Sequence, residues 1–322
     1  MTLRILTYDE LPRERMAEQA GVQIAAFGGF WTPSVVRAYR RSGSRLSEYV
    51  GVYAVDDGVL VGQILVFRVP YRFPDGSTAP VAGLAAVTTR PDAMRRGVAR
   101  ALLDDVHRRE RVAGITDALL WTNRSWVAYR LYETAGYRTL YSPGWALRVC
   151  RGRQALPPGW SLTPGNRTVL DEVESLHTQR SGDRIGFAAR SPGTLRADAR
   201  AGDVQPSNLL VLRHDGRLEG YAYAARETGI LRCGELVTAS PAADSMLLQG
   251  LESRAAGGLL AVGYTGQTDR REELSRRGYI VAPGSWWVLM GALLDPHLDP
   301  ARAPIRFGAD DPRFVCMALD RF

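Results

Sequence analysis

The stretch that decides the fold is VTTRPDAMRRGVARALL, residues 87–103. It begins with β-branched residues typical of a strand, passes through a short basic turn, and ends in an apolar pattern at helical spacing. A helix N-terminus has unpaired backbone N–H groups and a partial positive charge. Gly97 lets a ligand approach the backbone closely, and Arg95, Arg96 and Arg100 add full positive charge. The stretch therefore predicts a cradle for a pyrophosphate group.

This cradle differs from the two common phosphate-binding loops. The stretch contains no Gly-Lys-Ser or Gly-Lys-Thr, so it is not a P-loop, and its glycine spacing is not that of a dinucleotide-binding fold. NTPase and nicotinamide-dependent chemistry are therefore not expected at this site.

Composition narrows the class of protein further. A length of 322 residues suggests two domains, and 45% hydrophobic with 23% charged residues is ordinary for a globular protein. The chain has no apolar run of about 18 residues and no signal-peptide core, so we expect a cytoplasmic protein that does not enter a membrane. Its net charge of +7 comes from scattered arginines, which argues against nucleic-acid binding.

Cysteine and histidine usage gives no sign of a metal site. Cys150, Cys233 and Cys316 lie far apart and are expected to be reduced thiols. None of the four histidines stands at ligand spacing from cysteines or carboxylates, and His107 is expected on the solvated side of a helix. We expect no bound metal.

The chain repeats one pattern in order. The segment 52–62 consists of strand, Asp-Gly turn and strand, and the segment 210–220 has the same pattern. Later, Ala135-Gly136-Tyr137 is matched by Arg277-Gly278-Tyr279. Two copies of one domain, 1–150 and 151–322, joined at a Pro/Gly-rich linker, fit the length best.

Each copy is expected to be a mixed, mostly antiparallel sheet flanked by helices, which places the chain in the α+β class. In the first copy we expect helices at 16–26, 34–41, 98 onward and 126–135. The expected strands lie at 49–55, 59–69, 81–87 and 118–121, and two more at 137–141 and 145–149 close the unit.

The first copy resembles the GNAT acyltransferases. The resemblance covers most of residues 1–150, is strongest between 83 and 138, and rests on Val87-Thr88-Thr89, Arg95-Arg96-Gly97-Val98-Ala99, Asn123 and the segment YRLYETAGY at 129–137. The doubled form resembles the tandem branch that includes the Eis-type aminoglycoside acetyltransferases and mycothiol synthase. Met94 stands where the family has Arg or Gln, which is tolerable because the family holds phosphate mainly through backbone N–H groups.

The resemblance implies an N-acetyltransferase with acetyl-CoA as co-substrate and a small-molecule primary amine, aminoglycoside-like or other, as acceptor. It assigns coenzyme binding to Val87, Thr88, Thr89, Arg95, Arg96, Gly97, Val98, Ala99, Arg100 and Asn123. It also implies that a backbone N–H near Val87 polarises the thioester and that Tyr132 protonates the departing thiolate. No cysteine lies near the expected thioester in sequence, so direct transfer in a ternary complex is expected.

Several residues keep an alternative structural role. Tyr132 could be a packing residue, with Tyr129 as the rival acid. Asn123 could form a turn with Ser125, and Arg100 could be a solvated helix residue.

The general base stays open. No Glu lies in the segment 83–87, whereas many GNAT enzymes carry one there. In Eis-type relatives the C-terminal carboxylate serves, which here would be that of Phe322, and water-mediated deprotonation is the other choice.

The second copy lacks the chemistry of the first. Its segment 237–246 has neither glycine nor arginine at the loop, and Leu274 stands where Tyr132 stands in the first copy. We expect the second copy to be structural or to line the acceptor site. The aromatic residues Phe27, Phe30, Trp31, Trp286 and Trp287 are candidates for acceptor-site walls or for core.

Other functions remain open from sequence alone. A shell of this kind could bind acetyl-CoA as a sensor or scaffold, or use a different acyl-CoA. The acceptor and a homo-oligomeric state are not determined by the sequence.

Overall fold

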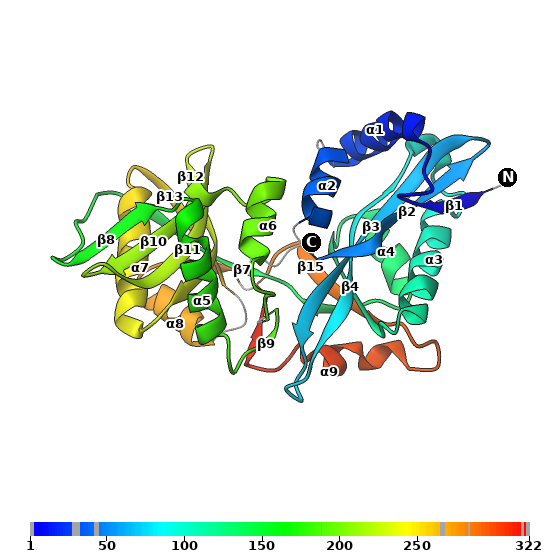
Figure 1. Ribbon diagram of the computed structural model, residues 1–322. Helices are drawn as coiled ribbons and strands as arrows, with labels where there is room; N and C mark the ends of the chain where they lie inside the picture. Colours follow the sequence, from blue (N-terminus) through cyan, green and yellow to red (C-terminus); the bar gives the residue numbers. More distant parts are fainter. Residues whose placement is uncertain are drawn as a thin grey trace.

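The computed structural model describes residues 3–27, 33–41, 45–187, 189–264, 268–282, 284–316 and 319. It consists of two mixed sheets with helices on their faces, which confirms the expected α+β class (Figure 1). The first sheet has the strand order β1-β2-β3-β4-β5-β15-β6. Its strands are β1 Arg4–Thr7, β2 Leu46–Asp56, β3 Val59–Arg72, β4 Thr78–Thr89, β5 Asp117–Asn123, β15 Trp287–Leu293 and β6 Arg138–Tyr141.

The second sheet repeats this order strand for strand. Starting from the matching edge, its order is β8-β10-β11-β12-β13-β7-β14. Its strands are β8 Trp160–Pro164, β10 Leu209–His214, β11 Arg217–Glu227, β12 Ile230–Thr238, β13 Gly258–Tyr264, β7 Gly144–Cys150 and β14 Ile280–Ala282. In both sheets the fourth and fifth strands pair in parallel, β4 with β5 and β12 with β13. The two Asp-Gly turns predicted an internal repeat, and the two sheets indeed share the same arrangement of strands.

The two halves exchange one strand each. Strand β7 lies between β13 and β14 of the second sheet, and β15, orange in Figure 1, lies between β5 and β6 of the first. The expectation that a strand at 145–149 closes the first unit is therefore wrong. A cut at residue 150 does not separate the two sheets, because the alternation of a strand fixes its conformation but not its partner.

Helices cover both faces of the first sheet. The helices α1 Met16–Phe27 and α2 Pro33–Arg41 pack on one face, where Val22 and Tyr39 enter the core. The helices α3 Val98–Val112 and α4 Val127–Thr134 pack on the other face through Leu102 and Tyr132. The remaining helices are α5 Leu170–Arg180, α6 Thr194–Ala201, α7 Pro241–Arg254, α8 Thr268–Arg276 and α9 Ala303–Phe307.

Short elements complete the chain. The strands β9 Ile185–Gly186 and β16 Phe314–Val315 pair in parallel, and β9 reaches β3 at Arg72. Single 3₁₀ turns occur at Arg13–Arg15, Pro91–Ala93, Arg167–Val169, Pro206–Asn208 and Pro300–Arg302. No helix within the described ranges has the length and apolar character needed to cross a membrane.

Polar contacts join α2 and the segment that follows it to α6 and the segment that follows it, across the junction of the halves. The Tyr39 hydroxyl donates to the Asp203 carboxylate. The Arg45 guanidinium lies 2.9 Å from the Asp198 carboxylate, and these side chains are only 10% and 2% exposed. The second half therefore holds a helix of the first half in place.

Candidate active site

The central feature of the site is a divergence between β4 and β5. The two strands pair only where Ala82–Leu84 faces Ala118–Leu120. Strand β4 continues to Thr89 and β5 to Asn123 without further pairing between them. An opening between parallel strands at their carboxyl ends is a common place for a ligand in α/β structures.

A β-bulge lies on β4 beside this divergence. Strand β3 pairs Leu65 with Ala85 and Gln63 with Thr88, so Ala86 and Val87 together oppose a single residue. Ala86 has a φ of 48°, a left-handed conformation that is uncommon for residues other than glycine. A bulge leaves backbone groups without a ladder partner. This is the local geometry that a backbone donor at Val87 requires.

The turn before α3 has the geometry expected of an anion cradle. Gly97 is the N-cap of this 15-residue helix, has a φ of 80°, and provides no side-chain cap. A Cβ built on Gly97 would meet no atom within 4 Å, so the space above the turn is open. The first N–H groups of the helix, those of Val98, Ala99 and Arg100, therefore remain available to a bound anion.

The three arginines of the cradle differ in their contacts. Arg96 pairs with the carboxylate of Asp56, which is only 6% exposed. Arg100 pairs with Asp104, with Nε 3.0 Å from Oδ1, and donates to the carbonyl oxygen of Thr134. Arg95 is exposed and makes no ion pair with any residue in the described ranges. Arg95 is thus the cation that can reach a ligand without first breaking a protein contact.

The Tyr132 side chain lies on the face of α4 that packs into the core. It is 4% exposed, and its ring contacts that of Tyr137 edge to face with centroids 5.9 Å apart. Burial raises the pKa of Tyr132 above the usual value for tyrosine, so the hydroxyl stays protonated at neutral pH. No residue that the structure describes hydrogen-bonds to this hydroxyl. The Tyr129 hydroxyl, by contrast, lies 3.0 Å from Thr139 Oγ1.

The expectation that His107 lies on the solvated side of its helix is wrong. Its Nε2 lies 2.9 Å from the Tyr137 hydroxyl, and burial lowers its pKa to about 4. The imidazole is therefore neutral at pH 7. The sequence could not show this pairing, because it depends on α3 and the end of α4 packing on the same face of the sheet.

Asn123 forms the turn that was its alternative role. Its Oδ1 accepts hydrogen bonds from the backbone N–H of Ser125 at 2.9 Å and from the Ser125 hydroxyl at 2.8 Å. The turn leads from β5 into α4 and so fixes the direction of the helix that carries Tyr132.

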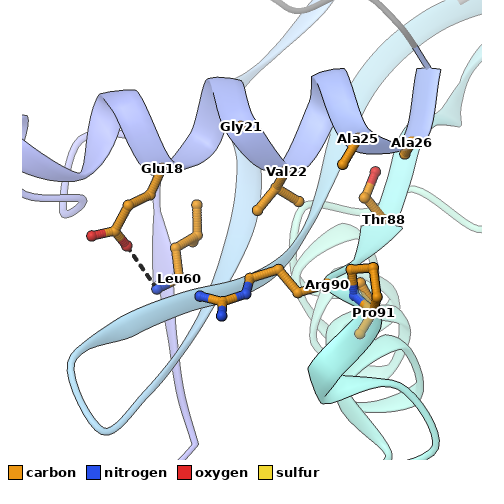
Figure 2. Close-up of a pocket in the computed structure, with 10 residues that line it drawn as sticks. Glu18, Gly21, Val22, Ala25, Ala26, Leu60, Thr88, Arg90 and Pro91 are labelled. Atoms are coloured by element: carbon orange, nitrogen blue, oxygen red, sulfur yellow. Dashed lines mark hydrogen bonds between the residues drawn. The ribbon is translucent and has the colours of Figure 1, made fainter.

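Sequence analysis missed a pocket of about 380 Å³ between α1 and the end of β4 (Figure 2). It is lined by Glu18, Gly21, Val22, Ala25, Ala26, Leu60, Thr88, Thr89, Arg90 and Pro91. Thr88 and Thr89, assigned to the coenzyme, form part of this wall. The small residues at 21, 25 and 26 of α1 were the available signal, because they leave space against the sheet.

The charges of this pocket are partly neutralised. The Glu18 carboxylate accepts from the Leu60 backbone N–H at 2.9 Å. Although burial opposes it, this bond and the neighbouring Arg15 lower the pKa of Glu18, so the carboxylate is ionised at neutral pH. The Arg90 guanidinium pairs with Asp92. Glu18 is thus a fixed negative charge rather than a strong base.

Several expected residues lie outside the described ranges. These are Phe30, Trp31 and Phe322, together with the side chain of Phe27. In the second copy, Leu274 is fully buried, as an apolar replacement for the tyrosine would be. The described residues contain no group of three or more metal-ligating side chains.

The fold and the geometry of the site resemble those of a GNAT-type acyltransferase domain. Residues 7–140 match the family model described as "Acetyltransferase (GNAT) domain". This part of the chain is therefore similar to the GNAT acetyltransferases.

Individual relatives agree with this assignment. An uncharacterized N-acetyltransferase of Streptomyces avermitilis is 28% identical over 213 residues, which are 62% of this chain, and the chain spans about half, 49%, of that relative's length. A probable N-acyltransferase of unknown function from Enterococcus faecalis has a TM-score of 0.68 at 16% identity, covering 92% of this chain and 73% of the other. Eis1 of Mycobacterium abscessus has a TM-score of 0.62 at 18% identity, covering 91% and 74%. The two structures establish likeness of fold.

Proposed function

We propose that the chain transfers the acetyl group of acetyl-CoA to a primary amine of a small molecule. The observation that carries the proposal is the uncapped start of α3 at Gly97, placed directly after a strand that diverges from its neighbour. Backbone N–H groups and Arg95 at this turn suit the pyrophosphate of the coenzyme. The divergence between β4 and β5 gives its pantetheine arm a path toward the bulge at Val87.

The remaining groups suit the chemistry of acyl transfer. A backbone N–H at the bulge polarises the thioester carbonyl, and attack by the amine forms the new C–N bond as the C–S bond breaks. The Tyr132 hydroxyl then donates its proton to the leaving thiolate. A raised pKa suits this step, because the donor must be protonated before it acts.

The amine must lose a proton to attack. Glu18 is ionised and engaged by a backbone N–H, so it suits attraction of a cationic amine better than abstraction of its proton. Transfer of that proton to water leaves the mechanism without a dedicated base.

The proposal is tested first by coenzyme binding. Arg95→Glu combined with Arg96→Glu is expected to weaken coenzyme A binding, measured by calorimetry, by at least tenfold, or about 1.4 kcal/mol. Arg108→Glu is the control, because Arg108 lies on the same helix beside Asp105, away from the N-terminus. Unchanged affinity in the double variant, or no coenzyme binding by the unaltered protein, contradicts the proposal.

Turnover is tested by thiol release with a panel of amines. Acetyl-CoA compared with longer acyl-CoA donors decides which acyl group is used, since the cradle recognises the pyrophosphate and not the acyl chain. Coenzyme binding without thiol release on any amine would favour a sensor over an enzyme.

A further inference from the structure

Three exposed tryptophans lie where β15 begins and α4 begins, and two of them are in contact. Trp126, Trp286 and Trp287 are 44%, 68% and 45% exposed. The rings of Trp126 and Trp287 meet edge to face with centroids 5.1 Å apart. Side chains of this size are normally buried, and a cluster left in solvent marks a binding surface. We call these three residues the tryptophan platform.

The backbone beneath the platform is held on two sides. The Arg124 backbone N–H donates to the carbonyl oxygen of Trp286 at 2.8 Å. The Ser142 hydroxyl donates to the carbonyl oxygen of Ser285 at 2.9 Å, and its oxygen accepts from the Ser285 N–H at 3.0 Å. A surface that is already ordered loses little conformational entropy when a ligand binds.

The platform lies beside the proposed site of transfer. Trp287 is the register partner of Asn123, the last residue of β5, and so stands at the end where β4 and β5 diverge. Trp126 directly precedes α4, the helix that carries Tyr132. Trp287 begins β15, the strand that the second half contributes to the first sheet, and Trp286 directly precedes it.

We propose that the tryptophan platform binds a flat apolar ring of the acceptor amine. This inference rests on the proposed function. An indole face stacks on a flat ring. The proposed pyrophosphate cradle follows β4, whereas the platform lies at the end of β5, the other strand of the divergence. Within the proposed function, we therefore assign the platform to the acceptor.

The test compares a ring-bearing amine with an aliphatic one. Phenethylamine and n-butylamine serve as probes, with acetyl-CoA as donor and thiol release as readout. Trp287→Ala is expected to lower kcat/KM for phenethylamine by at least about tenfold through KM, and to change that for n-butylamine little. Trp287→Phe, which keeps a flat ring, restores most of the loss.

Trp160→Ala is the matched control variant. Trp160 stacks on His214 in the second half, away from the platform, so its removal should leave the ratio of the two amines unchanged. Thermal unfolding of each variant checks that the fold is retained.

Three results would overturn the platform while leaving the proposed function intact. They are an unchanged amine ratio in Trp287→Ala, a loss of coenzyme A affinity in that variant, and a shift of oligomeric state that shows a second copy covering the surface. The unaltered protein could bind coenzyme A and yet acetylate neither amine. In that case phenethylamine should still quench tryptophan fluorescence in the unaltered protein and not in Trp287→Ala. Absence of that difference also overturns the proposed role of the platform. Failure to bind coenzyme A at all counts instead against the proposed function.

Discussion

Replacing Tyr132 by Phe removes one oxygen atom and tests the proposed acid directly. The ring is 4% exposed and keeps its edge contact with Tyr137, while no described residue loses a hydrogen bond. The free energy of unfolding should therefore stay the same or rise by up to about 1 kcal/mol. A positioned general acid contributes roughly 10²–10⁴-fold, so kcat should fall by at least about 100-fold.

Tyr137 provides a matched control on the same core. It is fully buried, and its hydroxyl lies 2.9 Å from His107 Nε2. Tyr137→Phe leaves that nitrogen buried without a partner and should lower the free energy of unfolding by about 1–3 kcal/mol. The rate of thiol release at saturating substrates should change little, because this hydroxyl is engaged by the imidazole.

The two variants should thus show opposite signatures in two assays. Urea denaturation reports stability, and thiol release at saturating acetyl-CoA and amine reports kcat. A Tyr132→Phe protein that turns over at the unaltered rate would refute the assignment of the acid. So would a loss of activity that tracks a loss of stability in both variants, because Tyr132 would then be a packing residue only.

Four further predictions follow from buried charges and close contacts. Glu235→Gln removes the carboxylate charge that pairs with Arg190, 2% exposed, and should lower the free energy of unfolding by about 3–5 kcal/mol in urea denaturation. A double variant with Arg190→Met should recover much of this, and no recovery would contradict the pairing. Asp198→Asn weakens the contact of α6 with Arg45, which lies between α2 and β2, and should raise KM for the amine without changing coenzyme affinity by calorimetry; equal effects on both ligands would count against it. Gly291→Ala places a Cβ 2.7 Å from the core side chains of Leu140 and Phe307 and should lower the free energy of unfolding by about 1–3 kcal/mol, so an unchanged Tm would argue against the observed position of β15. Burial holds His107 neutral in the folded protein, with a pKa of about 4, so on acidification the unfolded chain binds a proton at this histidine first. The free energy of unfolding should therefore fall as pH drops from about 6.5 toward 4. The fall should be smaller in His107→Asn, and an identical fall would refute His107 as its cause.

The sequence predicted the features that depend on near neighbours. The start of α3 at Val98 and the turn at Asn123, one of the two roles expected for that residue, both follow from a few adjacent residues. Chemical character at such a turn is set locally, which is why the cradle could be placed before any contact was known.

Features that depend on distant partners were not predictable in the same way. His107 on α3 pairs with Tyr137 beyond α4, and Trp287 pairs with Asn123 across more than half of the chain. Neither the alternating pattern of β7 nor the continuous apolar run of β15 specifies which sheet the strand joins. The pocket beside Glu18 was missed for a related reason, since empty space arises from the packing of α1 on β4.

The crossing of β7 and β15 also sets the order in which this molecule can be completed. As the ribosome releases the early residues, the sheet that carries the cradle has a vacant position between β5 and β6, with hydrogen-bonding edges on both sides. That position is filled only after Trp287–Leu293 has been synthesised, long after Arg95 and Tyr132 have emerged. The first sheet, with the proposed site on it, is therefore complete only after the second half's β15 has been synthesised.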